Sequence, residues 1–128
     1  MPLVRIAHTT GKPAAYVEAL SSGVHRAMTE TFGVPEDDFF QIITEHKPKT
    51  GLVGPDTFMD IDHTDDMVFV QITCAEGRST AQKKALFAGI VANMTANGDL
   101  RAEDVIINLV ETKAENWSFG NGIAPFAS

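Results

Sequence analysis

Hydrophobic positions change period along the second half of the chain, and each change marks a predicted element. Residues 68–74 are apolar and β-branched, as expected of a strand. Ser79 with Gln82 three residues later predicts a capped helix start, and Asn97-Gly98 predicts its end. Val105–Val110 is then a second strand. The apolar positions at helical spacing between the two strands are Leu86, Ile90 and Met94, with Ala85 and Gly89.

The first half has the same pattern. Leu3–His8 reads as a strand, Pro13 suits the first turn of a helix that runs to about Phe32, and Phe39–Glu45 reads as the second strand. Residues 1–46 align with residues 67–112 without a gap and give 12 identities in 46 positions. We therefore predict one domain with repeat one at 1–46, a linker at 47–66, repeat two at 67–112 and a C-terminal tail at 113–128.

A strand-helix-strand unit with a crossover helix makes its two strands parallel and its crossover right-handed. Two such units predict an α+β fold: a four-stranded mixed sheet with two helices on one face. Val105–Val110 is apolar at odd and even positions alike, and such strands expect cover on both sides. The helices of one chain cover only one face. The other face is therefore expected to pack against copies of the chain.

Composition narrows the classes of partner. The net charge of −7 without a Lys/Arg cluster argues against nucleic acid and anionic membranes, but allows a small anionic substrate. Cys74 is the sole cysteine and reads as a small buried hydrophobe. The chain shows no signal peptide, no apolar run of about 20 residues and no metal-ligand spacing. We expect a cytoplasmic protein without metal or cofactor, and a solvated linker whose acidic residues are Asp60, Asp62, Asp65 and Asp66.

The candidate chemistry lies at the amino terminus. Pro2 follows the initiator methionine, which is normally removed before a small residue. The mature chain would then begin with a secondary amine, whose reference pKa is about 8 and falls on burial or beside a cation. Such an amine suits general acid or base catalysis near neutral pH. If Met1 is retained, the Pro2 nitrogen is a tertiary amide and can do neither. From the residue alone, a plain Met-Pro start is the alternative.

A family resemblance favours the catalytic interpretation. Over nearly its whole length the chain resembles the tautomerase superfamily, and within it most closely the malonate semialdehyde decarboxylase group. The resemblance implies a homotrimeric enzyme that uses an amino-terminal proline. The segments that carry it are Pro2-Leu3-Val4-Arg5-Ile6, residues 32–38 (Phe-Gly-Val-Pro-Glu-Asp-Asp), Arg78-Ser79 with Gln82-Lys83, and residues 104–120 from Asp104-Val105-Ile106 to Trp117-Ser118-Phe119-Gly120.

The resemblance also implies roles for single residues. Pro2 matches the catalytic proline and Asp38 the catalytic aspartate, although Asp104 holds the same place in repeat two and both could simply shape a turn. Arg78 matches the second arginine of a pair that binds the substrate carboxylate, and a surface ion pair is its alternative. Glu76 replaces the first arginine and would repel an anionic substrate. Further substrate-binding candidates are Lys12, the repeat partner of Arg78, and the aromatic residues Trp117, Phe119 and Phe126.

Three functions follow, in order of preference. The first is keto–enol tautomerisation of a small 2-oxo acid, with Pro2 as the base and Arg78 on the carboxylate. The second is decarboxylation or hydration of a 3-oxo acid such as malonate semialdehyde, with cationic Pro2 and with Asp38 directing water or substrate. The substitution at Glu76 weighs against this second function. The third is a non-catalytic trimeric binding protein.

Overall fold

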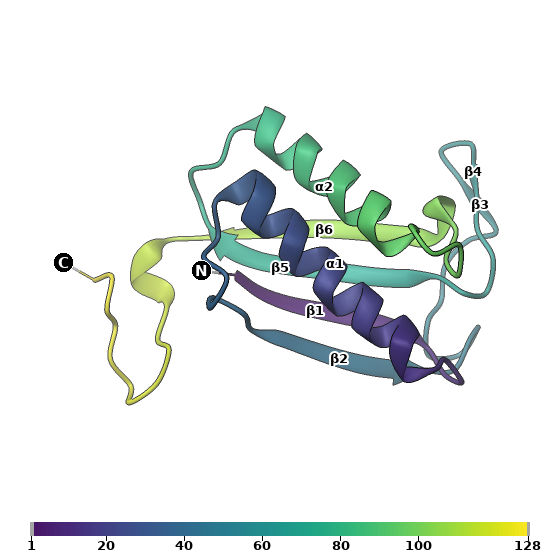
Figure 1. The fold of residues 1–128 in the computed structure, drawn as a ribbon, viewed down its shortest axis with the longest axis horizontal. Helices are drawn as coiled ribbons and strands as arrows, with labels where there is room; N and C mark the ends of the chain where they lie inside the picture. Colours follow the sequence, from purple (N-terminus) through teal and green to yellow (C-terminus); the bar gives the residue numbers. More distant parts are fainter. Residues whose placement is uncertain (1, 128) are drawn as a thin grey trace.

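The structure is a computed structural model that describes residues 2–127 of the 128-residue chain, so Met1 and Ser128 lie outside the described residues. Four strands form one sheet in the order β2-β1-β5-β6: β1 (Pro2–Thr9), β2 (Gln41–His46), β5 (Val68–Ala75) and β6 (Val105–Thr112). Strands β1 and β2 are parallel, β5 and β6 are parallel, and the central pair β1–β5 is antiparallel. Helices α1 (Ala14–Phe32) and α2 (Thr80–Met94) lie side by side on one face of this sheet (Figure 1).

The two halves repeat in their hydrogen bonds as well as in their elements. The Thr10 amide donates to the His46 carbonyl oxygen at 3.0 Å, and at the equivalent place in repeat two the Glu76 amide donates to the Thr112 carbonyl oxygen at 2.8 Å. Each half is a parallel strand-helix-strand unit. The α+β fold with a mixed four-stranded sheet and both helices on one face is therefore confirmed.

Positions that are identical between the repeats form much of the core between sheet and helices. Four apolar pairs among them have almost no exposed surface and come from matching strands and matching helices, whereas identical positions such as Gly11 and Glu45 are exposed. Each apolar pair therefore packs in an equivalent place, which is a physical reason for the identity. These pairs are Val4 with Val70, Ile6 with Ile72, Leu20 with Leu86, and Met28 with Met94.

Several element ends differ from prediction. The predicted capping box is present, because the Ser79 hydroxyl accepts from the Gln82 amide and the Gln82 side chain returns to the Ser79 amide. Pro13, however, is the N-cap of α1 and lies before its first turn. Helix α2 ends at Met94 instead of at 97–98, because Thr95 leaves helical geometry while its hydroxyl donates to the Val91 carbonyl oxygen at 2.7 Å. In addition, β2 starts at Gln41, two residues later than expected.

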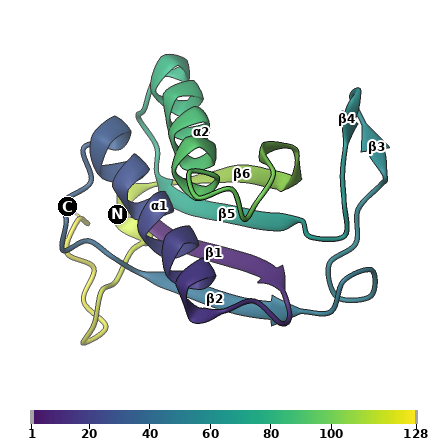
Figure 2. The ribbon, with the colours of Figure 1, turned by 45° about the vertical axis from the view of Figure 1, so that its right-hand side comes forward.

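The linker between the repeats carries a small hairpin, β3 (Thr57–Phe58) with β4 (Ile61–Asp62), beyond the end of the sheet (Figure 2). Short 3₁₀ turns at Ala102–Asp104 and Ala114–Asn116 flank β6. No helix among residues 2–127 is long and apolar enough to cross a membrane.

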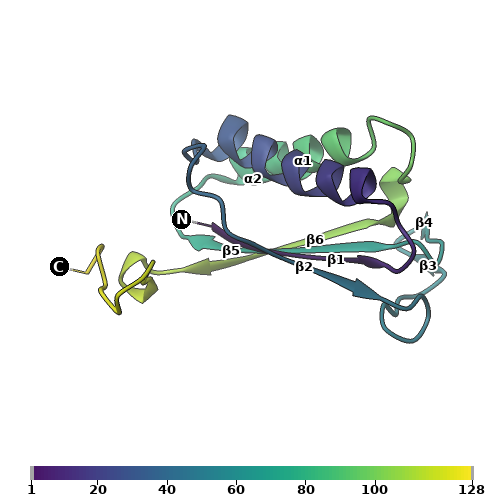
Figure 3. The same ribbon diagram turned by 60° about the horizontal axis from the view of Figure 1, so that its bottom comes forward.

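The sheet face away from the helices is uncovered (Figure 3). It carries apolar side chains on both edge strands, and Ile106 is 37% exposed there. A hollow of about 500 Å³ runs across the face, lined from all four strands by residues that include Ile42, Phe69 and Ile106. The strands that were predicted to be apolar on both sides thus leave one apolar side open to solvent in the single chain.

Tyr16, on the buried side of α1, yields a stability prediction. Tyr16 is 3% exposed, and its hydroxyl has no hydrogen-bond partner among the described residues. Burial, followed by the charges of Asp66, Asp104 and Asp99, raises the pKa of Tyr16 to about 12. A raised folded-state pKa contributes stability that is present below about pH 10 and is lost between about pH 10 and pH 12.

Tyr16→Phe is therefore expected to leave the chain as stable as wild type at pH 7, or about 1 kcal/mol more stable, because no hydrogen bond is lost. Between about pH 10 and pH 12 the wild type should lose roughly 2–3 kcal/mol that the variant keeps. Denaturant unfolding of both proteins at pH 7, pH 10 and pH 12 measures these differences in the free energy of unfolding. Equal alkaline losses in the two proteins would show that the phenol does not titrate as described.

Candidate active site

Pro2 is the first residue of a central strand and its side chain is buried. Across the antiparallel ladder it faces Cys74 of β5. On its other side the parallel ladder with β2 begins two residues later, where Val4 pairs with Gln41 and the Val4 amide donates to the Phe40 carbonyl oxygen at 3.0 Å. The start of β1 therefore lies between the end of β5 and the segment that precedes β2.

Cys74 is the β5 residue that pairs with Pro2. It is 2% exposed, which confirms the prediction of a small buried hydrophobe. Burial raises the pKa of the Cys74 thiol, and the positive charge of Arg78 opposes that rise. The cation of Arg78 thus acts electrostatically on the residue that pairs with Pro2.

Asp38 lies in the turn before β2, where its amide donates to the Pro35 carbonyl oxygen at 3.1 Å. Its side chain is half-buried. Together with Asp37, Phe40, Phe119 and Phe126 it lines a hollow of about 220 Å³. A carboxylate and three aromatic rings therefore meet at the end of the sheet where β1 begins.

The C-terminal tail contributes Phe119 and Phe126 to the lining of this hollow, and Trp117 packs against Phe119. Trp117 and Phe119 stack with ring centroids 5.6 Å apart, and Phe119 meets Phe40 at 5.6 Å and Phe126 at 6.0 Å. The Trp117 indole Nε1 donates to the Thr112 hydroxyl at 2.7 Å. That hydroxyl in turn donates to the Cys74 carbonyl oxygen at 3.1 Å, so Trp117 is tied to the strand beside Pro2.

Arg78 is held in place by backbone groups. Its guanidinium donates to the carbonyl oxygens of Ala75 and Phe32, each at 3.2 Å, and lies 5.0 Å from the centroid of the Phe32 ring. Among residues 2–127 it forms no ion pair, so the surface ion pair considered for it is absent from this part of the chain. Two of its five N–H donors serve to anchor it, and the fork is fixed in direction.

Glu76 and one further pair complete the charges at this end. Glu76 is exposed, and its amide donates to the Thr112 carbonyl oxygen at 2.8 Å. Lys83 Nζ lies 2.9 Å from Glu111 Oε1, and its hydrogen bond holds the pKa of Glu111 below the usual range. Since Lys83 is neutralised by Glu111, Arg78 is the cation at this end that has no carboxylate partner among the described residues.

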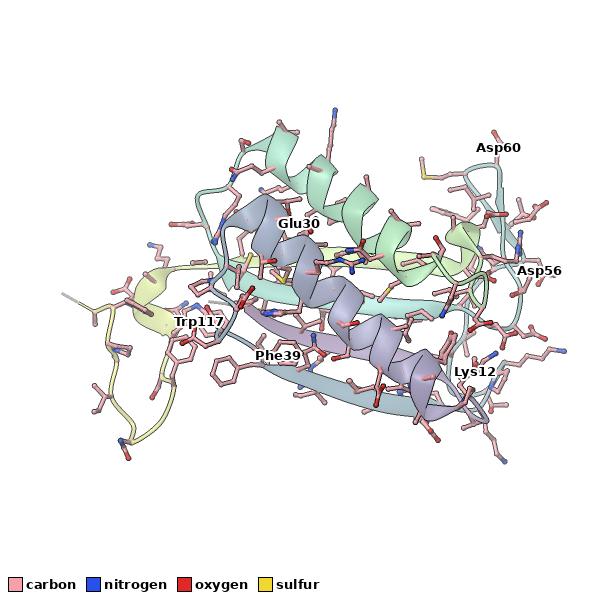
Figure 4. The ribbon with its side chains drawn as sticks, in the orientation of Figure 1. Lys12, Glu30, Phe39, Asp56, Asp60 and Trp117 are labelled. Atoms are coloured by element: carbon pink, nitrogen blue, oxygen red, sulfur yellow. The ribbon has the colours of Figure 1, made fainter. Side chains whose placement is uncertain are left out.

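Lys12 does not join this group within the chain. It follows the opposite end of β1, and the length of that strand separates it from Pro2 by roughly 25 Å. Figure 4 shows Lys12 and Trp117 at opposite ends of the molecule. Its ammonium lies 3.2 Å from Asp66 Oδ1 and 5.3 Å from the centroid of the Tyr16 ring. The antiparallel β1–β5 pairing is the reason, because it places equivalent positions of the two repeats, such as Lys12 and Arg78, at opposite ends of the sheet.

Sequence reasoning missed Phe40, Phe32 and Thr112. Phe40 lines the hollow, the Phe32 ring packs against the Arg78 guanidinium, and the Thr112 hydroxyl accepts a hydrogen bond from the Trp117 indole. The position of Phe40 two residues after Asp38 was an available signal. Nothing in the pattern pairs Phe32 with Arg78 or Thr112 with Trp117.

Comparisons with known proteins agree with this arrangement. Two family models described as tautomerase enzymes match residues 38–120 and residues 2–61. The chain is 36% identical over 124 residues to a probable tautomerase, YusQ, of Bacillus subtilis (strain 168), covering 97% of each chain.

Solved structures show the same fold. A malonate semialdehyde decarboxylase with decarboxylase and hydratase activities superposes with a TM-score of 0.87 at 29% identity, covering 97% of this chain and 95% of that one. A symmetric trimer of a fused 4-OT superposes with a TM-score of 0.75 at 21% identity over 94% of each chain, which concerns the fold alone. A buried proline that starts a central strand of a doubled strand-helix-strand sheet, together with these matches, places the chain in the tautomerase family of enzymes.

Proposed function

We propose that the chain, once Met1 is removed, is an amino-terminal-proline tautomerase that converts the enol and keto forms of a small 2-oxo acid. The observation that carries the proposal is the position of Pro2: it is buried at the start of β1 and paired with Cys74, whose thiol is acted on by the charge of Arg78. The aromatic hollow lies at the same end of the sheet. No other nucleophile or metal-binding group of this end is needed for the reaction.

Burial and the nearby charge of Arg78 both disfavour a protonated amine, so the Pro2 nitrogen is expected to act as a base. It takes a proton from the hydroxyl of the enol, or from the carbon next to the carbonyl in the reverse direction. The proton is then returned to the other atom, so no net proton is gained or lost. Arg78 holds the carboxylate and stabilises charge on the enolate oxygen.

The test is a direct assay of processed protein. The substrate is the enol form of an aryl 2-oxo acid. An aryl group is chosen because Phe40, Phe119 and Phe126 line the hollow. Loss of enol ultraviolet absorbance should be faster than in buffer, and the amino terminus should be confirmed by mass spectrometry. Processed protein that does not exceed the buffer rate would overturn the proposal.

A second candidate is decarboxylation or hydration of a 3-oxo acid. It is favoured by the half-buried Asp38, which lies in the turn before β2 at the Pro2 end of the sheet, and by the likeness to malonate semialdehyde decarboxylase. The exposed Glu76, close to Arg78 in the chain, opposes binding of such a compact anion. Release of CO₂ from malonate semialdehyde faster than ketonisation of the enol would favour this candidate over the first.

We further propose that three copies of the chain pack their open sheet faces together. Support comes from the exposed apolar residues of β2 and β6, among them Ile42 and Ile106, and from the trimeric assembly of the fused 4-OT with the same fold. Burying that hollow between copies removes apolar surface from water, which stabilises association.

Light scattering of the wild type at micromolar concentration is therefore expected to give a mass of three times the 13.8-kDa chain. Ile106→Asp should shift the mass toward one chain, because it puts a charge on the face to be buried. Met59→Asp is the matched control, since Met59 is an exposed apolar residue of the linker hairpin, which lies beyond the end of the sheet, and it does not line the hollow of this face. A trimer that survives Ile106→Asp but not Met59→Asp would place the interface elsewhere.

A further inference from the structure

We propose that the end of the sheet opposite Pro2 is a second carboxylate-binding site, and that the linker fills it with the chain's own Asp66. The argument starts from the repeat. In the alignment of the two halves, Lys12 is the counterpart of Arg78, and Asp104 is the counterpart of Asp38. Because β1 and β5 run antiparallel, Lys12 and Asp104 belong to the end of the sheet that mirrors the Pro2 end.

The donors at this end converge on one carboxylate oxygen. Asp66 Oδ1 accepts from the Thr9 hydroxyl at 3.1 Å and lies 3.2 Å from Lys12 Nζ. Thr9 is fully buried, and the Lys12 side chain is 24% exposed against 56% for that of Asp66. The donors are thus built into the fold, and the carboxylate reaches them from the solvent side. A free carboxylate could approach the same donors from that side.

Tyr16 gives an independent sign of a binding site. Its ring lies under the Lys12 ammonium, 5.3 Å from Nζ to the ring centroid. Tyr16 is only 3% exposed, and its hydroxyl has no hydrogen-bond partner among residues 2–127. The charge of Asp66 is felt at this hydroxyl, where it adds to burial in raising the pKa of Tyr16. A buried polar group without a partner is costly, and a ligand could satisfy it.

The linker is fastened at a second point, two residues before Asp66. The buried Asp104 carboxylate accepts from the Thr64 amide at 2.8 Å and from the Thr64 hydroxyl. Residues 64–66 are therefore bound to Lys12, the counterpart of Arg78, and to Asp104, the counterpart of Asp38. The counterpart of Pro2 itself is Val68, which offers no amine. This end can bind a carboxylate but lacks the base for catalysis, and Asp66 keeps it closed.

The test removes the internal carboxylate and supplies a free one. Asp66→Ala is titrated with sodium acetate against sodium chloride at equal ionic strength. The readout is the ring ¹³C signal of Tyr16, the sole tyrosine of the chain, which reports on this end alone. Acetate is expected to shift the signal with saturation, because it takes the place of Asp66 on Lys12 and Thr9. The wild type should respond at least about tenfold more weakly, since an intramolecular carboxylate competes at high effective concentration.

Asp65→Ala is the matched control. Asp65 is the neighbouring residue, its side chain is 57% exposed, and it pairs with Lys49 at 3.4 Å without a buried donor. The Tyr16 signal of the Asp65→Ala variant should shift with acetate no more than that of the wild type. The double variant Asp66→Ala/Lys12→Met should lose the response. Asp66→Asn, which keeps the side-chain size, should show the same saturable shift at lower affinity.

If neither Asp66 variant responds more than Asp65→Ala, the Lys12–Asp66 contact is an ordinary surface ion pair and the proposal is wrong. Turnover at Pro2 separates this result from the proposed function. Asp66→Ala should keep tautomerase activity within about twofold of wild type. The acetate response is expected whether or not Pro2 proves to be catalytic.

Discussion

Pro2→Ala in the processed chain is expected to lower kcat/KM for enol ketonisation by on the order of 100-fold or more. General base catalysis contributes about 10²- to 10⁴-fold, and the variant keeps a primary amine that is neither ring-constrained nor equally placed. Pro2 is buried and is the first residue of β1, where it pairs with Cys74 of β5. An alanine at the chain end loses that packing as well as the secondary amine.

The matched control is the wild-type chain with Met1 retained, for example after preparation without methionine aminopeptidase. Its Pro2 nitrogen is an amide, so it should be at least as inactive as the variant. The pH–rate profile gives a further check. If the neutral amine is the base, the rate of the processed wild type rises with pH until the amine is deprotonated, and the unprocessed chain shows no such rise. Equal turnover by processed wild type and Pro2→Ala would exclude Pro2 as the catalyst.

Arg78→Ala is expected to lower kcat/KM for 2-oxo acids by roughly tenfold to a hundredfold, equivalent to about 1.5–3 kcal/mol for a charge-assisted contact. Arg78 also ties the Ala75 and Phe32 carbonyl oxygens together, so the variant should lose some stability. The comparison that isolates binding is therefore between acids and neutral ketones of similar shape. Neutral ketones should lose little, because they have no carboxylate to hold.

Two further variants refine this result. Arg78→Lys should recover only part of the activity on acids, since an ammonium cannot make the forked contact or stack as well on Phe32. Glu76→Arg removes an exposed negative charge near the site and should tighten binding of short 3-oxo acids. If Arg78→Ala reduces activity on acids and neutral ketones by one common factor, its role is to join α1 to the end of β5, and carboxylate binding lies elsewhere.

The order of elements and the composition of the core were predictable from the chain alone. Changes in the spacing of hydrophobic residues located the strands and helices, and the repeated strand-helix-strand pattern predicted which strands are parallel. Identical pairs such as Ile6 with Ile72 became core positions, because equivalent elements pack in equivalent places. Element ends were not predicted as closely: α2 stops at Met94 because the Thr95 backbone leaves helical geometry, with φ −101° and ψ 0°, which periodicity does not register.

The separation of charges was decided by tertiary structure. Lys12 and Arg78 are equivalent in the sequence repeat, yet they lie at opposite ends of the sheet because the two central strands are antiparallel. Only Arg78 thereby lies near Pro2, while Lys12 meets Asp66. The aromatic partner of Arg78, Phe32, likewise comes from the other repeat, so local pattern could not reveal it.

What the sequence by itself determined was the doubled strand-helix-strand fold and the proline that begins its first strand, since these depend on local periodicity and on a repeat that preserves every spacing. What only the tertiary structure decided was the surroundings of that proline. The tail returns to Phe40 through Phe119, and Phe32 fixes Arg78, through contacts between residues that are far apart in the chain. Such contacts depend on the three-dimensional packing of whole elements, which hydrophobic periodicity within one segment does not encode.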